Sequence, residues 1–168
     1  MGARMPKLKY LVDTNVWIDL YVESRPCHDA ADALVRASVS SSVKLYHAVT
    51  TEKDVFFTLA QSYKCDERAQ GCPTEEMYNA IAETAWACTE HMERLSTPVG
   101  QDLFDLRLAH GFRFAHNDLE DNLVLAAAKR AEVDAVVTSD KRFIAHATAV
   151  AVPALTPQQA LDLINALS

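Results

Sequence analysis

Two short apolar runs that each end at an aspartate most constrain what this chain can fold into. LKYLV, residues 8–12, is followed by Asp13, and DAVVTS, residues 134–139, is followed by Asp140. Short runs dominated by Leu, Val and Ala are typical of strands that are buried on both faces of a sheet. Because such strands occur in parallel sheets covered by helices, the pattern favours an α/β fold.

Segments with helical character separate these strands from others along the chain. Further strands are expected in VKLYHAV, in STPVG and just before Pro153. The expected helices cover residues 16–22, 27–39, 51–64, 74–95, 101–111 and 118–131 and a last segment from Thr156. Strands that alternate with helices predict a three-layer α/β/α sandwich with a central, mostly parallel sheet. No linker or repeat divides the chain, so we expect a single domain over residues 1–168.

The composition limits where such a chain works. No apolar run is long enough to span a membrane, and the first ten residues are too short and too polar for a secretory signal. The four cysteines form no CxxC pair, which favours reduced thiols, and a cytoplasmic location is expected. Cys88 and His91 have a metal-ligand spacing, but no second pair accompanies them, so a structural zinc site is not expected.

The formal net charge of −7 argues against a protein that holds nucleic acid with a general basic surface. It does not exclude a nuclease. An enzyme that binds cations through a cluster of acids is locally negative, and the bound metal supplies the charge that meets the phosphate.

Several acids follow the expected strands. In an open parallel sheet, ligands bind beyond the carboxyl ends of the strands. Each acid alone could be a helix cap or a first-turn charge. Together they would repel one another and raise their pKa values unless a hard cation such as Mg²⁺ or Mn²⁺ lay between them. The acids expected at this edge are Asp13, Asp54, Asp118, Asp121 and Asp140.

The motifs resemble a PIN domain, as in the VapC-type toxins of toxin–antitoxin pairs. The resemblance covers residues 8–167 and is carried by YLVDTNVWIDL, TTEKDVFFTLA, DLEDNLVLAAAKRAEVDAVVTSDKRF and a closing strand and helix, in that order. It implies a PIN-like fold and a Mg²⁺- or Mn²⁺-dependent endoribonuclease, a hydrolase that leaves 5′-phosphate and 3′-hydroxyl ends. It also implies a homodimer that is held inactive by a cognate antitoxin.

The same resemblance assigns roles to individual residues. It makes Asp13, Asp121 and Asp140 both catalytic and metal-binding. The second acid is Asp54 or Glu52, and the Thr-x-x-acid spacing from Thr51, which also looks like a helix cap, favours Asp54.

Other polar residues near the acids are expected to support them. Thr14 and Asn15 complete the DTN motif and would orient Asp13 or a water molecule. Ser139, with Thr138, would do the same for Asp140, and Asp118 would be an outer ligand or a cap. The histidines near the acids, His110 and His116, are expected on the surface or at a cap rather than in catalysis.

Rival functions fit the sequence less well. A haloacid-dehalogenase-type phosphatase would need a second aspartate where Asn15 stands, and a nucleotide-binding Rossmann module would need GxGxxG after the first strand. The remaining alternative is a PIN-fold binding protein of weak or lost activity that acts through partners. A dimer face is expected on residues 27–39 and 51–63, while the choice between a toxin and a housekeeping ribonuclease stays open.

Overall fold

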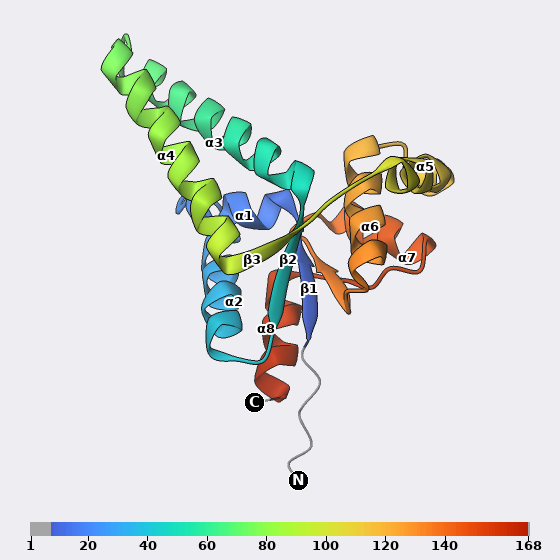
Figure 1. Ribbon diagram of the computed structural model, residues 1–168. Coiled ribbons are helices and arrows are strands. Elements are labelled where there is room, and N and C mark those ends of the chain that lie inside the picture. Colours follow the sequence, from blue (N-terminus) through green and yellow to red (C-terminus); the bar gives the residue numbers. More distant parts are fainter. Residues whose placement is uncertain (1–7, 168) are drawn as a thin grey trace.

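A five-stranded sheet forms the centre of the computed structural model, which describes residues 8–167 (Figure 1). All neighbouring strands run parallel, in the order β3-β2-β1-β4-β5. The strands are β1 (Lys9–Val12), β2 (Lys44–Ala48), β3 (Ser96–Val99), β4 (Ala135–Val137) and β5 (Ala154–Leu155).

Helices cover both faces of the sheet, which confirms the three-layer α/β/α architecture (Figure 1). One face packs against α1, α2, α3, α4 and α8, and the other against α5, α6 and α7. The helices are α1 (Thr14–Tyr21), α2 (His28–Ser40), α3 (Val49–Gln70), α4 (Glu75–Leu95), α5 (Leu103–Gly111), α6 (Leu119–Ala131), α7 (Lys141–Ala149) and α8 (Pro157–Ala166), with a 3-10 turn at Phe112–Phe114.

The side chains of the central strand β1 show why helices must cover both faces of the sheet. Successive side chains of a strand point to opposite sides. Tyr10 and Val12 enter the core beneath α1 and α2, whereas Leu11 enters the core beneath α6. All three side chains are almost completely buried, so β1 cannot lie at an edge of the sheet.

The helices α3 and α4 form a long antiparallel hairpin that extends beyond the sheet (Figure 1). At its base, Val55, Leu59 and Ala85 are buried in the core. Further out, most side chains of both helices are exposed and polar. No helix within residues 8–167 is long and apolar enough to cross a membrane.

Three local expectations from the sequence were wrong or incomplete. The closing strand follows Pro153 instead of preceding it. The carbonyl of Pro153 accepts a hydrogen bond from the backbone N–H of Val136 at 2.8 Å, which proline can do although it has no N–H to donate. Helix α3 begins at Val49 directly after β2, so Thr51 is buried within the first turn and is not the cap. The sequence analysis also did not anticipate α7.

The strand order creates the position for a ligand site. The chain builds outward from β1 to β2 and β3, and then crosses back to form β4 on the other side of β1. The connections leave β1 and β4 in opposite directions, which opens a crevice at their carboxyl ends. The backbone N–H of Asp13 donates to the carbonyl of Val137 at 2.9 Å and fixes these two strand ends side by side.

Two positions on α2 test the packing against the sheet. Leu34 is completely buried, whereas Val39 is 71% exposed. We expect Leu34→Ala to lower the free energy of unfolding by about 2–5 kcal/mol, because it removes buried methyl groups and leaves a cavity. Val39→Ala should change it by no more than about 0.5 kcal/mol. Chemical denaturation measures both, and equal losses would contradict this packing of α2.

Candidate active site

Asp13 occupies the centre of the crevice, directly after β1. Its carboxylate accepts a hydrogen bond from the backbone N–H of Thr14 at 2.8 Å, as expected of a residue that caps α1. The other carboxylate oxygen accepts from the hydroxyl of Thr138, also at 2.8 Å. Only 5% of the residue is exposed, so its geometry is set by the ends of β1 and β4.

The environment of Asp13 disfavours its charge. Burial is the largest cause, and together with the negative charges of Asp121 and Asp140 it raises the pKa of Asp13 to about 6. The hydrogen bonds from Thr138 and Thr14 act in the opposite direction, because they favour the ionised form. A buried carboxylate with this balance lacks a positive partner.

Asp121 approaches the same crevice from the first turn of α6. One of its oxygens lies 2.6 Å from Nε2 of His116. Burial raises the pKa of Asp121, the negative charges of Asp118 and Asp140 add to this, and the contact with His116 opposes it. Asp118 itself caps α6 by accepting from the backbone N–H of Glu120 at 2.9 Å.

Asp140 closes the crevice from the start of α7. It caps this helix by accepting from the backbone N–H groups of Arg142 and Phe143, at 2.7 and 3.4 Å. Its negative charge raises the pKa values of both Asp13 and Asp121. The structure therefore brings together Asp13, Asp121 and Asp140 at one edge of the sheet.

The two candidates for the second acid point to different surroundings. Glu52 lies 2.8 Å from Nε2 of His47, a completely buried residue whose Nδ1 contacts the hydroxyl of Ser96 at 2.8 Å. Asp54 pairs instead with the exposed Lys53 at 3.0 Å, while its own side chain is 18% exposed. Glu52 thus belongs to the contact between β2 and β3.

Glu120 feels the charges of both Asp54 and the crevice acids, and it was not among the expected site residues. Its side chain contacts solvent, yet partial loss of hydration raises its pKa, and the charges of Asp54, Asp118, Asp13 and Asp121 raise it further. The Glu120 side chain remains exposed, so only these charges relate it to the acids of the crevice.

Only some of the residues that were expected to support the acids form hydrogen bonds with them. Thr14 supports Asp13 through its backbone N–H, while its hydroxyl is buried without a hydrogen-bond partner among residues 8–167. The half-buried side chain of Asn15 likewise makes no hydrogen bond within that range. Thr138 orients Asp13, and its hydroxyl also accepts from the backbone N–H of Asp140 at 3.1 Å.

Ser139 was expected to orient Asp140, and this was wrong. Its hydroxyl donates to the carboxylate of Asp19 at 2.6 Å. Asp19 is 2% exposed and forms an ion pair with Arg25 at 2.5 Å. The sequence does contain a signal, an aspartate within the apolar helix NVWIDL, but it does not reveal the partner.

Two histidines also border the crevice. The rings of His116 and His146 stack with centroids 3.7 Å apart and an angle of 21° between their planes. His116 was considered from the sequence as a surface or cap residue, and His146 was not considered because α7 was not foreseen. His110, the other histidine considered, is exposed on α5.

The crevice suits a hard cation with oxygen ligands. Within residues 8–167, no lysine or arginine forms an ion pair with Asp13, Asp121 or Asp140. Burial, with a smaller addition from the charges of Asp121 and Asp140, raises the pKa of Asp13, and a divalent cation would favour its ionised form. Carboxylates at a sheet edge open to solvent are the donors that Mg²⁺ and Mn²⁺ prefer.

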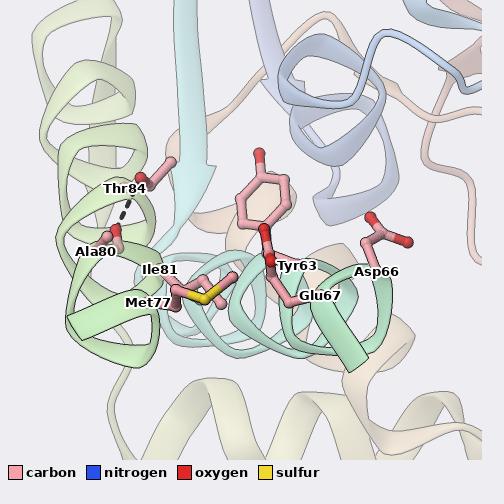
Figure 2. Close-up of a pocket in the computed structure, with 7 residues that line it drawn as sticks. All are labelled: Tyr63, Asp66, Glu67, Met77, Ala80, Ile81 and Thr84. Atoms are coloured by element: carbon pink, nitrogen blue, oxygen red, sulfur yellow. Dashed lines mark hydrogen bonds between the residues drawn. The ribbon is translucent and has the colours of Figure 1, made fainter. Parts of the chain in front are cut away.

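A separate hollow, of about 360 Å³, lies between α3 and α4 on the hairpin (Figure 2), and none of the four candidate acids lines it. Tyr63 from α3 and Ile81 from α4 contribute apolar surface, while Asp66 and Glu67 make one side acidic. Nearby on the same helices, Phe57 and Trp86 are exposed. The hairpin therefore offers apolar side chains beside negative charge.

One comparison with known proteins identifies a family. A family model described as PIN domain matches residues 9–142. None of the curated proteins compared with the chain matches it.

Three solved structures share the fold. VapC20 from Mycobacterium tuberculosis, described as a toxin that cleaves the sarcin–ricin loop, has a TM-score of 0.59 and 14% identity over 85% of this chain and 95% of its own. VapBC2 from Rickettsia felis, bound to a DNA fragment of its promoter, has a TM-score of 0.61 and 8% identity over 89% and 98%. PAE2754 from Pyrobaculum aerophilum has a TM-score of 0.57 and 16% identity over 95% and 91%.

The raised pKa of Asp13 predicts how stability depends on pH without metal. The folded protein keeps this proton up to about pH 6, whereas in the unfolded chain the pKa of Asp13 lies near the ordinary aspartate value of 3.8. The unfolded state therefore binds fewer protons in this window, and Asp13 lowers the stability by about 3 kcal/mol as the pH rises through it. In Asp13→Asn this contribution should be absent, so the variant should be more stable than the parent at pH 7.

Denaturation in the presence of a chelator, from pH 4 to pH 7, measures this difference. Asp162→Asn, at an exposed position on α8, is the control and should follow the parent curve. Parallel curves for the parent and Asp13→Asn would contradict the buried, uncompensated charge.

Proposed function

Since this chain belongs to the PIN domain family, we propose that it is a divalent-metal-dependent endoribonuclease that hydrolyses RNA phosphodiester bonds. The observation that carries the proposal is the convergence of Asp13, Asp121 and Asp140 at the switch point of the sheet, where Asp13 is buried and the charges of the other two acids reach it. The similarity in fold to VapC20, a toxin that cleaves the sarcin–ricin loop, supports RNA as the substrate class.

The proposal gives each acid a role. Asp13, Asp121 and Asp140 hold Mg²⁺ or Mn²⁺, which when bound supplies positive charge to the phosphate and lowers the pKa of a water molecule. Thr138 keeps Asp13 oriented and favours its ionised form through the hydrogen bond at 2.8 Å. Asp54 is the fourth catalytic acid, and its charge reaches the crevice region at Glu120.

Exposed basic side chains next to these acids are suited to the phosphates that flank the cleaved bond. Lys53 lies beside Asp54 on α3, and Lys141 and Arg142 begin α7 directly after Asp140. Since the net charge of the chain is −7, these few cations, and not a basic surface, would orient the RNA.

We further propose that the chain is the toxin of a toxin–antitoxin pair and acts as a homodimer. The similarity to the fold of VapBC2 supports an antitoxin partner. The exposed Phe57 and Trp86 support a protein interface on the α3–α4 hairpin. Helix α2 is a weaker candidate for the dimer face, because Leu34 and Val35 pack into the core.

A PIN-fold binding protein with little activity is the second candidate. The ion pair of Asp54 with Lys53 favours it, because a carboxylate that is shorter than glutamate and already paired reaches less far into the crevice. The cleavage experiment separates the two candidates.

Purified protein incubated with a mixed, labelled RNA pool tests the activity. We expect cleavage with Mg²⁺ or Mn²⁺, none with a chelator, and 5′-phosphate ends on the products. Asp121→Asn should lower the rate more than about 100-fold, since losing a direct ligand exceeds the usual 10- to 100-fold effect of losing an outer partner. Asp162→Asn should cleave as the parent does, and metal-independent cleavage would contradict the proposal.

Substitutions at the two candidates for the second acid should have different effects on cleavage and on stability. Asp54→Asn should lower the cleavage rate strongly while changing the stability little, because the only ion pair that it removes within residues 8–167 is with the exposed side chain of Lys53. Glu52→Gln should chiefly lower the stability, because it removes a charged partner of the buried His47. Cleavage rates and denaturation curves of both variants provide the measurement, and the reverse pattern would make Glu52 the second acid.

A further inference from the structure

Two imidazole rings lie beside the carboxylate crevice and have no role in the proposed hydrolysis. His116 comes from the segment that precedes α6, and His146 comes from the later part of α7. Their rings stack with centroids 3.7 Å apart. Asp121 joins them, because its carboxylate lies 2.6 Å from Nε2 of His116.

The three side chains place possible donor atoms close together. One nitrogen of each histidine and one oxygen of Asp121 all lie within 4.8 Å of one another. Ligand atoms around a four-coordinate Zn²⁺ are about 3.3 Å apart, given metal–ligand distances near 2.0–2.1 Å. Because imidazole binds a metal in the plane of its ring, the two histidines must rotate out of their stacked arrangement to direct their nitrogens at one ion.

One nitrogen of this cluster lacks a hydrogen-bond partner. Nδ1 of His146 is buried, and nothing in the part of the chain that the structure describes forms a hydrogen bond with it. Buried polar atoms are normally paired, so an unpaired imidazole nitrogen beside a second imidazole and a carboxylate points to a ligand.

A buried asparagine holds the backbone of the cluster in place. The side-chain amide of Asn122 donates to the carbonyl of His116 at 2.9 Å, and Asn122 is 2% exposed. This contact ties His116 to α6, the helix that carries Asp121. Outer contacts of this kind hold metal ligands in position.

We propose that His116, His146 and Asp121 bind a transition-metal cation of the Zn²⁺ type, at a site adjacent to the carboxylate crevice. Imidazole nitrogen favours Zn²⁺ over Mg²⁺, whereas an all-carboxylate site favours Mg²⁺ or Mn²⁺. Asp121 belongs to both sites, so the two kinds of metal compete for its oxygens. Only this sharing rests on the proposed function; the binding of Zn²⁺ does not.

Titration of the metal-free full chain with Zn²⁺, in competition with a chromophoric chelator, tests the site. We expect the binding to weaken more than about tenfold in His146→Gln, because one of three protein ligands is lost. Asp140→Asn should keep its Zn²⁺ affinity and lose affinity for Mn²⁺. The Mn²⁺ affinity is measured from the electron paramagnetic resonance signal of free Mn²⁺. His110→Gln removes an exposed histidine outside the cluster and should bind Zn²⁺ as the parent does.

Co²⁺ in place of Zn²⁺ reports the coordination through its visible absorption. An intense four-coordinate spectrum in the parent, lost in His146→Gln, is the expected result. Equal Zn²⁺ affinity of the parent and His146→Gln would overturn the proposal, as would a Zn²⁺ site that Asp140→Asn removes. A chain that binds Zn²⁺ as expected but does not bind Mn²⁺ would instead count against the metal-dependent nuclease, so the two failures are distinguishable.

Discussion

The burial of a carboxylate at the end of β1, beside two further acids, is the constraint on which the rest of the site depends. Asp13 is almost completely buried, and the charges of Asp121 and Asp140 reach it from two other elements. Burial is the main cause of the raised pKa of Asp13, so the folded chain holds this group where its ionised form is disfavoured. The apolar cores on both faces of the sheet supply the stability that permits such an arrangement.

The parallel sheet makes this convergence possible with few residues. Asp13 and Asp140 follow neighbouring strands, so the register of β1 with β4 fixes their separation without long loops. The same two aspartates cap α1 and α7, and their backbone hydrogen bonds limit side-chain freedom. Thr138 joins the two, because its hydroxyl contacts both the carboxylate of Asp13 and the backbone of Asp140.

The sequence was sufficient to predict the parts of the site that depend on strand ends. A buried run followed by an aspartate predicted Asp13 and Asp140 at the sheet edge, and the resemblance to PIN domains added Asp121. It was not sufficient for contacts between distant side chains. The pairing of Ser139 with Asp19 joins residues 120 positions apart, and nothing in either local pattern encodes it. The stacking of His146 on His116 required the unforeseen helix α7, whose weak signal is a short run of alanines and mixed polar residues.

Asp121 shows how one side chain can serve two chemistries. His116 lies 2.6 Å from this carboxylate and is its partner. Within residues 8–167, no lysine, arginine or histidine forms such a contact with Asp13 or Asp140. A cation in the crevice must therefore compete with an imidazole for Asp121, whereas it meets no such competitor at Asp13. The affinity for a hard cation then depends on how firmly His116 is held, and the amide of Asn122 and the ring of His146 are the contacts that hold it. The histidine pair thus governs the availability of one ligand without touching the other two.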